Sequence, residues 1–342
     1  MRAPKRLKRP PRVRAIPAVE KVLQAVRGDA AALELPRPLV VAAVRRVLAG
    51  LRAGAGGASF DDAVATTRIA LRSLAASRLR PVINGTGVVV HTNLGRAPLP
   101  AQAIRALGTL NAGYCNLELD LATGGRGARA PYLEGALAIL CGADAAIVVN
   151  NCAAALVLAL RHFVAARPGA TEVVISRGEL IQIGGGFRIP EILEASGAVL
   201  REVGTTNRTE LRDYAGALSK KTALVLKVHR SNFFMEGFVD GPTTRELAAL
   251  ARKRRVPFVS DLGSGAIVDT PALLGGDAQD GGGPREPTVE EELRAGADLV
   301  LFSGDKLFGG PQAGVVVGKR RLVERLGRDP FFRALRASKA WP

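Results

Sequence analysis

The sequence predicts an α/β fold whose sheet is mainly parallel, with a small helical unit ahead of it. From residue 146 onward, short apolar and β-branched segments recur at 146–149, 172–176, 198–203, 222–228, 256–261, 298–303 and 314–318. Helix-like segments such as "CAAALVLALRHFVAA" and "TTRELAALARKRR" separate most of them. Because strand and helix alternate at this spacing, we expect βαβ units with helices on both faces of a parallel sheet.

The N-terminal part shows a different pattern. Residues 1–14 hold seven Lys or Arg, three prolines and no acidic residue, a composition typical of a disordered arm. Between residues 15 and 76 apolar side chains recur at helical spacing, and the glycine-rich stretch 53–59 separates the last two predicted helices. We therefore predict a small helical domain over 15–76. Farther along, "GGDAQDGGGPREP" (275–287) is predicted to be a flexible surface insertion.

The chain of 342 residues is strongly basic, with a formal net charge of +17. Such a charge favours an anionic partner, either nucleic acid or an anionic small substrate. The alternative is compositional, because only 10 of the 48 basic residues are lysines and the chain is simply rich in arginine. Aromatic residues make up 4% of the sequence, which leaves few rings to stack on bases. Any RNA contact is therefore expected to be mainly to backbone and shape.

Several observations argue against membrane insertion and secretion. The sequence has no apolar run of about 18 residues, and its basic N-terminus lacks the apolar segment of a signal peptide. The three cysteines, Cys115, Cys141 and Cys152, show no CxxC spacing and form an odd set. We expect a cytoplasmic protein with no disulfide and no metal site.

Polar residues gather directly after the predicted strands. In parallel sheets ligands bind beyond the carboxyl ends of the strands, so a functional site is expected at these positions. They are Asn150–Asn151, Ser176–Glu179, His229–Asn232, Asp261–Gly263 and Ser303–Lys306. A lysine, an aspartate and a histidine are among them, so the site combines a nucleophile with charged groups.

Lys306 is the lysine best placed for covalent catalysis, because it follows a predicted strand and has small neighbours in "SGDK". Lys227 lies inside a predicted strand, and the remaining lysines lie in charged or terminal segments. A lysine amine can bind an aldehyde cofactor as a Schiff base when burial or a neighbouring charge lowers its pKa. Pyridoxal phosphate is such a cofactor.

Pyridoxal phosphate also needs a carboxylate at its pyridinium nitrogen and a site for its phosphate. Asp261 ends a predicted strand and is the candidate carboxylate. The segment Asn150–Ala154 joins a strand to an alanine-rich helix, where free N–H groups and the helix dipole favour a phosphate, and Ser303 adds a hydroxyl. The alternatives are structural: a strand-end aspartate is often a cap or turn residue, and Asn-Asn often caps a helix.

The three histidines differ in their expected roles. His229 and His91 each follow a strand-like run, so both are candidates for the site, and His229 is the better candidate for packing on a cofactor ring. An ordinary buried histidine is the alternative for both. His162 lies in a predicted helix and is expected to be structural.

Six long stretches of the sequence are recognisable together. They are "INGTGVVVHTNLGRAPLP" (83–100), "TGGRGARAPYLEGALAILCGADAAIVVNN" (123–151), "ISRGELIQIGGGFRIPEIL" (175–193), "KVHRSNFFMEGF" (227–238), "SDLGSG" (260–265) and "FSGDKLFGGPQAG" (302–314). In this order they resemble bacterial selenocysteine synthase, L-seryl-tRNA(Sec) selenium transferase. The similarity extends from about residue 15 to residue 339, and the opening "IPAVEKVL" also resembles the start of the family.

The resemblance implies a fold-type-I enzyme that depends on pyridoxal phosphate. Residues 15–76 would bind tRNA, and residues 77–330 would form the cofactor-binding catalytic core. The implied reaction converts seryl-tRNA(Sec) to selenocysteinyl-tRNA(Sec) with selenophosphate, by β-elimination followed by selenium addition. The family also implies a homo-oligomer, a decamer assembled as a pentamer of dimers.

The resemblance carries over to individual residues. Lys306 is implied to be the Schiff-base lysine, and Asp261 the partner of the pyridinium nitrogen. Further cofactor contacts are expected from Asn150, Asn151, Cys152, Ala153, His229 and Ser303. Arg96, Arg333 and Arg336 fall on anion-binding motif positions, and planar guanidinium groups suit selenophosphate. For Arg333 and Arg336 a solvated helix face is the alternative.

The resemblance has one clear departure. The family continues past the position of Pro342 into a small C-terminal domain, whereas this sequence ends 36 residues after Lys306. We therefore expect residues 331–342 to be the start of a truncated C-terminal domain. Two alternative functions stay open: a related lyase acting on a small amino acid or amino sugar, and an inactive tRNA-binding remnant.

Overall fold

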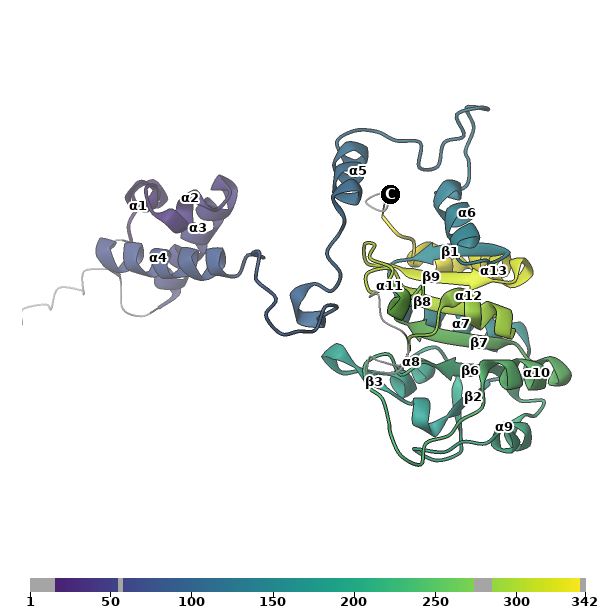
Figure 1. Ribbon diagram of the computed structural model, residues 1–342. Helices are drawn as coiled ribbons and strands as arrows, with labels where there is room; N and C mark the ends of the chain where they lie inside the picture. Colours follow the sequence, from purple (N-terminus) through teal and green to yellow (C-terminus); the bar gives the residue numbers. More distant parts are fainter. Residues whose placement is uncertain (1–15, 55–57, 274–284, 339–342) are drawn as a thin grey trace, which may run out of the picture. The chain divides into compact units, whose positions relative to one another are not determined.

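The computed structural model describes residues 16–54, 58–273 and 285–338 (Figure 1). The chain divides into two compact units, Met1–Ile83 and Asn84–Pro342, and each is described by itself. The predicted basic arm lies outside the described residues, as does most of the predicted insertion. Among the described helices, none combines the length and the apolar character needed to cross a bilayer.

The described part of the first unit is helical. It contains α1 (Val19–Val26), α2 (Ala30–Leu33), α3 (Arg37–Ala53) and α4 (Phe60–Ala76). The Ser59 side chain accepts a hydrogen bond from the N–H of Asp62, and Asp62 accepts one from the N–H of Ser59, so a capping box begins α4. The most deeply buried side chains of this unit include Val22, Val26, Val44, Leu48 and Leu71. The small helical region predicted from the periodicity is thereby confirmed.

A seven-stranded sheet organises the described part of the second unit. Its strands are β1 (Ala145–Val149), β2 (Glu172–Ser176), β5 (Val199–Val203), β6 (Thr222–Val228), β7 (Phe258–Gly263), β8 (Leu299–Ser303) and β9 (Gly314–Gly318). They lie in the order β1-β9-β8-β7-β6-β2-β5 (Figure 1). Among these strands, β9 pairs antiparallel with its two neighbours β1 and β8 and the other pairs are parallel, so β9 is reversed and the other strands point the same way. The mainly parallel sheet is confirmed, and each predicted segment forms one of its strands.

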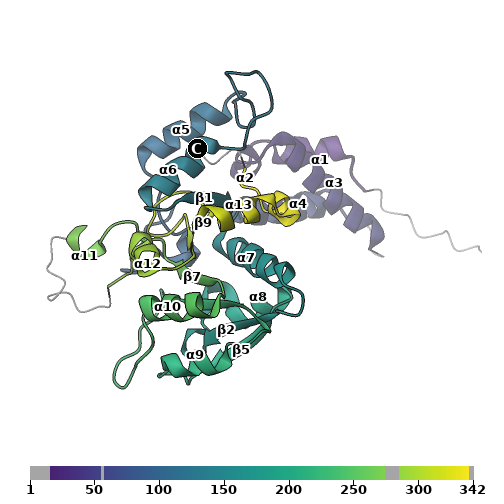
Figure 2. The ribbon, with the colours of Figure 1, turned by 90° about the vertical axis from the view of Figure 1, so that its right-hand side faces the viewer.

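Helices cover both faces of this sheet, because alternate residues of a strand point to opposite sides. Val149 and Leu226 pack on one face with α7, α8 and α13, whereas Val148 and Val225 pack on the other with α6, α9, α10 and α12. Figure 2 shows α7 and α8 on one side of the strands and α10 and α12 on the other. The bounds are α6 (Pro131–Leu140), α7 (Cys152–Ala166), α8 (Ile189–Ala195), α9 (Leu211–Ala217), α10 (Thr244–Arg254), α12 (Val289–Ala295) and α13 (Arg320–Arg328).

Short elements connect these layers. They are η1 (Thr92–Leu94), α5 (Ala101–Asn111), η2 (Arg177–Glu179), β3 (Gln182–Ile183), η3 (Gly184–Gly186), β4 (Phe187–Arg188), α11 (Thr270–Leu273) and α14 (Pro330–Ala334). β3 and β4 pair as a separate two-stranded sheet. Several of these elements follow the carboxyl ends of the parallel strands, where the sequence predicts the site.

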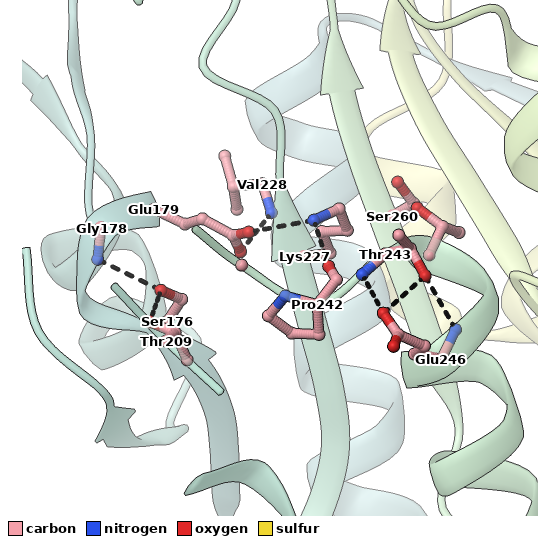
Figure 3. Close-up of polar contacts among 12 residues, drawn as sticks. Ser176, Gly178, Glu179, Thr209, Lys227, Val228, Pro242, Thr243, Glu246 and Ser260 are labelled. Atoms are coloured by element: carbon pink, nitrogen blue, oxygen red, sulfur yellow. Dashed lines mark hydrogen bonds and ion pairs between the residues drawn. The ribbon is translucent and has the colours of Figure 1, made fainter. Parts of the chain in front are cut away.

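The carboxylate of Glu179 ties together the ends of β2 and β6 (Figure 3). Glu179 lies in η2, directly after β2, and accepts a hydrogen bond from the N–H of Val228 at 3.0 Å. It also pairs with Nζ of Lys227 at 3.3 Å, and this amine donates to the carbonyl of Pro242 at the same distance. The Lys227 amine is therefore engaged in contacts that hold strand ends in place.

A second carboxylate is buried behind β7. Glu292 of α12 is only 8% exposed and accepts hydrogen bonds from Ser260 Oγ at 2.7 Å and from Thr244 Oγ1 at 2.9 Å. Ser260 belongs to β7 and Thr244 begins α10, so one side chain joins three elements. A buried polar group is tolerated only when hydrogen-bond partners surround it.

We predict that Glu292→Ala lowers the free energy of unfolding by about 2–4 kcal/mol, because it leaves two buried hydroxyl groups without an acceptor. Glu292→Gln keeps an acceptor and is expected to cost less. Urea unfolding measures both, with Glu290→Ala as the matched control, since the Glu290 side chain is 43% exposed and pairs with Arg294 on the surface. Equal stability of the Glu292→Ala and Glu290→Ala variants would contradict this account.

Candidate active site

A pocket of about 260 Å³ lies at the carboxyl ends of the parallel strands. Its walls come from the β1–α7 junction, the segment after β2, the ends of β6, β7 and β8, and the loop that contains Arg96. The lining residues are Arg96, Asn151, Cys152, Ala153, Ile181, Ile183, Gly184, Val228, His229, Ser231, Asp261, Gly263, Ser303, Lys306 and Gln312. Most of the predicted site residues therefore come together in one place.

Lys306 and Asp261 face the pocket from adjacent strands. Asp261 lies in β7, and Lys306 follows β8 by a short turn. Gly263 has a φ of 63°, a left-handed conformation that favours glycine. A Cβ at this position would lie 3.7 Å from Nζ of Lys306 and 4.0 Å from Oδ1 of Asp261. The glycine thus leaves space beside the amine and the carboxylate.

Asp261 is a buried carboxyl group with an unusual proton affinity. Burial raises its pKa to about 6, although the Lys306 amine, the Cys152 thiol and the N–H of Gly263 all act to lower it. The thiol lies close, with Cys152 Sγ at 3.6 Å from Asp261 Oδ1. Burial raises the pKa of Cys152 well above its usual value, so this thiol stays protonated and donates to the carboxylate.

The start of α7 offers backbone donors to the pocket. Asn151 caps this helix of 15 residues, and its Oδ1 accepts a hydrogen bond from the N–H of Ala154 at 2.8 Å. Within the described residues, the N–H groups of Cys152 and Ala153 donate no hydrogen bond, as expected for the first turn of a helix. The helix dipole adds to their attraction for an anion, and the buried Ser303 lines the same pocket.

Gly314 allows α7 to begin this close to the sheet. It is the first residue of β9, the reversed strand. A Cβ on Gly314 would lie 2.1 Å from the carbonyl oxygen of Asn151 and 2.9 Å from the nitrogen of Cys152. Since no side chain fits there, glycine at this position keeps the first turn of α7 at the pocket.

His229 lies in the pocket, as predicted. Its Nε2 is 3.0 Å from Oε2 of Glu286, and its backbone N–H donates to the carbonyl of Asp261 at 2.9 Å. His162 lies in α7, where its Nδ1 is 3.4 Å from Asp329 Oδ2. His91 is not among the residues that line this pocket, and Nδ1 of His91 is buried without a partner in the described part of the chain.

Arg96 contacts Asp305, the residue directly before Lys306. Nη1 of Arg96 pairs with Oδ2 of Asp305 at 2.7 Å, and the N–H of Ala97 donates to the carbonyl of Asp305 at 3.2 Å. Arg96 has a φ of 64°, a conformation that is costly for a residue other than glycine. Two contacts and a strained backbone therefore place this guanidinium group at the pocket wall.

The other two predicted arginines lie elsewhere in the second unit. Nη1 of Arg336 is 3.4 Å from Oε1 of Glu118, a carboxylate that also pairs with Arg129 at 2.7 Å. Arg336 lines a different cleft of about 770 Å³, and Arg333 is exposed. The structure does not bring Arg333 and Arg336 into the pocket of Arg96.

Three residues near the pocket differ from the sequence-based predictions. Asn150, a predicted cofactor contact, is exposed, and its N–H donates to the carbonyl of Leu335 at 2.9 Å. Gln312 lines the pocket, and its place in the recognised motif "GGPQAG" was a signal for it. Glu286 was missed because it falls within the stretch expected to be a flexible insertion.

Comparison with known proteins decides the family. A family model described as L-seryl-tRNA selenium transferase matches residues 82–341, and one described as selenocysteine synthase N terminal matches residues 13–52. The chain belongs to the L-seryl-tRNA selenium transferase family. The resemblance inferred from the six sequence motifs is thereby confirmed.

Curated relatives agree with this assignment. An L-seryl-tRNA(Sec) selenium transferase from Geotalea uraniireducens is 48% identical over 331 residues, which cover 95% of this chain and 69% of that protein. One from Carboxydothermus hydrogenoformans is 44% identical, with 96% and 69% covered. The solved structure of a D-glucosaminate-6-phosphate ammonia-lyase matches with a TM-score of 0.56 at 18% identity, covering 73% of this chain and 62% of that one. This last likeness shows the fold alone, and the predicted fold-type-I architecture is confirmed.

The cofactor of this family is pyridoxal phosphate, and the pocket residues fit it. Lys306 would supply the amine, Asp261 a buried carboxylate for the pyridinium nitrogen, and the first turn of α7 donors for the phosphate. A side chain at Gly263 would crowd the amine and the carboxylate, and glycine leaves that space open. The charges and donors of the pocket thus complement those of the cofactor.

Asp261 gives a prediction about stability and pH in the cofactor-free chain. The pKa of Asp261 is about 6 in the folded chain and ordinarily 3.8, so ionisation of Asp261 lowers the folding stability increasingly as the pH rises through these values, and has no effect well below them. As the pH rises from 4 to 7, we expect the stability of the Asp261→Asn variant relative to the unaltered chain to increase by about 2–3 kcal/mol.

Denaturant unfolding across this pH range measures the gain. Asp144→Asn is the control, because Asp144 is exposed in the same unit. A difference between the Asp261→Asn variant and the unaltered chain that does not vary with pH would contradict the raised pKa.

Proposed function

We propose that this chain catalyses the pyridoxal-phosphate-dependent conversion of seryl-tRNA(Sec) to selenocysteinyl-tRNA(Sec), with selenophosphate as selenium donor. The observation that carries the proposal is the convergence of Lys306, Asp261 and the start of α7 on one pocket. This pocket occurs in a chain 48% identical to a selenium transferase from Geotalea uraniireducens. The fold alone would leave the substrate undecided.

Lys306 has two roles in this proposal. Its amine would hold the cofactor aldehyde, and as a free amine Lys306 would take the proton from the serine α-carbon. Bound pyridoxal phosphate withdraws electrons from that carbon and so eases loss of the proton and then of the β-hydroxyl group. Lys306 holds this proton at Nζ and is placed to return it to the departing hydroxyl, which leaves as water.

Asp261 and Cys152 form the part of the pocket that would meet the cofactor ring nitrogen. The Asp261 carboxylate accepts the hydrogen bond of a protonated ring nitrogen and keeps that proton in place. Cys152, protonated and 3.6 Å from Oδ1 of Asp261, restrains the carboxylate without adding a charge. A buried carboxylate of fixed orientation is more effective than a solvated one because it needs no reorganisation.

Arginines are proposed to hold the anionic donor. Arg96 already lines the pocket, and its guanidinium group carries donors beyond the one used by Asp305. Arg333 and Arg336 lie outside this pocket within one chain, so we propose that they contact selenophosphate where subunits of the proposed oligomer meet. The selenium atom then adds to the β-carbon, while water takes up the phosphoryl group and phosphate leaves.

We propose that the first unit selects the tRNA. Exposed arginines of α3 and α4, at positions 45, 46, 52 and 72, present positive charge to solvent. The Selenocysteine synthase N terminal model overlaps this region over residues 13–52. Separation of tRNA binding from the sheet leaves the chemistry in the second unit undisturbed.

The assembly is proposed to be a cytoplasmic homo-oligomer, a decamer built from dimers. Large apolar side chains stay exposed in the described part of the second unit, among them Tyr114, Leu121, Tyr132 and Ile139. Exposed large apolar side chains are candidates for protein–protein interfaces when they form a continuous patch. A small-substrate lyase has no comparable support, because the ammonia-lyase likeness at 18% identity concerns the fold alone.

The covalent link gives a direct test. Purified chain loaded with pyridoxal phosphate and reduced with borohydride is expected to carry the label on the Lys306 peptide, measured by mass spectrometry. Lys306→Ala should abolish the label, whereas Lys227→Ala should retain it, because Lys227 pairs with Glu179. Labelling at Lys227 would disprove the assignment.

The division of labour between the two units gives another test. Charge reversal at Arg45, Arg46 and Arg52 is expected to weaken tRNA(Sec) binding and to reduce the slope of log affinity against log salt by about 2–3, since phosphate contacts are lost. Arg336→Ala should leave tRNA binding intact and lower the selenophosphate-dependent product by about tenfold or more.

Filter binding and product assays separate these effects. The control is Arg294→Glu, an exposed change in the second unit where Arg294 pairs with Glu290. Undiminished, salt-sensitive tRNA(Sec) binding after the triple charge reversal would place recognition elsewhere.

A further inference from the structure

Glu286 touches a residue of the cofactor pocket although it does not line the pocket itself. Its Oε2 lies 3.0 Å from Nε2 of His229, and both side chains are 25% exposed. His229 is also held by its backbone, whose N–H donates to the carbonyl of Asp261 at 2.9 Å. The backbone of His229 is therefore held by the sheet, and its ring is held by a carboxylate.

The direction of this hydrogen bond follows from the charge of Glu286. Burial acts to raise the pKa of Glu286, but the hydrogen bond with His229 and the nearby Lys306 amine hold this pKa below its usual range. Glu286 is therefore ionised at neutral pH and has no proton to give. Nε2 of His229 must be the donor, so the contact selects a ring protonated at Nε2.

The backbone that carries Glu286 is anchored on both sides. The preceding Arg285 pairs with Asp269 at 3.0 Å and with Glu291 at 2.7 Å. Two residues later, Thr288 and Glu291 form the capping box that begins α12. Since these contacts flank Glu286 directly, its carboxylate is delivered to His229 from a fixed segment.

We propose that Glu286 is the positioning residue of His229, holding its imidazole in one orientation and one protonation pattern at the cofactor pocket. A histidine in an active site commonly depends on a third group that orients it, and a carboxylate is the usual choice. The contact stands on the described geometry. Its importance for cofactor and substrate rests on the proposed function.

The positioning of His229 by Glu286 is needed for a geometric reason. An imidazole ring without a partner samples several rotamers and both neutral tautomers, and a misplacement of about 1 Å can cost a hundredfold in rate. The carboxylate of Glu286 removes this freedom while standing outside the space that cofactor and substrate occupy. Loss of Glu286 should therefore disturb His229 without removing any group that lines the pocket.

Chemical labelling of histidine tests the contact in the full chain, before cofactor is added. The sequence has three histidines, so mass spectrometry of peptides modified with diethyl pyrocarbonate follows each one separately. Glu286→Ala is expected to raise the modification rate of His229 by about tenfold, because a charge-assisted hydrogen bond no longer occupies Nε2. Glu286→Gln, which keeps an acceptor without the charge, should give an intermediate rate.

Internal references and a matched control separate this effect from general loosening. His91 and His162 should keep their rates in both variants, and Glu290→Gln, an exposed carboxylate of the same helix region, should change none of the three. An unchanged rate for His229 in the Glu286→Ala variant would overturn the proposal. Equal acceleration at all three histidines would overturn it as well.

The spectrum of the chain loaded with pyridoxal phosphate tests the link to the pocket. Glu286→Ala should shift the visible band in the same sense as His229→Asn, and the double variant should shift it no further, because both changes act through one group. Because Glu286→Gln keeps a hydrogen-bond acceptor, this variant should retain most of the spectrum of the unaltered chain. Additive shifts, or a spectrum identical to that of the unaltered chain, would overturn the positioning role.

Failure of the unaltered chain to bind the cofactor would count against the proposed function, and the labelling rates would still decide the contact.

Discussion

The electrostatic attraction between the buried Asp261 carboxylate and the Lys306 amine, at the ends of two adjacent strands, is the interaction on which the site depends. Asp261 is 7% exposed, and burial alone would drive it toward its neutral form. The amine of Lys306 opposes that tendency. The pairing of β7 with β8 shifts register between Asp261 and Gly263, and this irregularity lies where the two groups meet the pocket. The sheet, with apolar layers on both faces, keeps these groups in place.

This arrangement explains why so much of the site could be predicted from the sequence. Each of the short apolar segments became a strand, and six strands share one direction, so residues that follow them converge at one edge. Lys306, Asp261 and His229 are all found by that single rule. Ser303 and Asn151 follow it too. These predictions needed only local sequence information, because each residue was identified by its position after a predicted strand.

The parts that escaped prediction depend on contacts between distant segments. Arg336 pairs with Glu118, a partner 218 positions away, and no short-range pattern records such a pair. Asn150 was expected at the cofactor, but its N–H meets the carbonyl of Leu335. Glu286 follows a glycine-rich stretch, and composition gave no sign that the chain is anchored again at Arg285. Local propensity describes elements, whereas the partners of exposed and half-buried charges are set by the tertiary fold.

The glycine at the start of β9 has a wider consequence. Its absent side chain lets a reversed strand and the start of α7 share space that one methyl group would fill, since a Cβ on Gly314 would lie 2.1 Å from the Asn151 carbonyl oxygen. A larger residue at position 314 would force the β1–α7 junction and β9 apart, because the atoms it would meet belong to the backbone. One missing atom therefore couples the packing of the reversed strand to the position of the first N–H groups of α7, so a change here should affect folding and cofactor loading together.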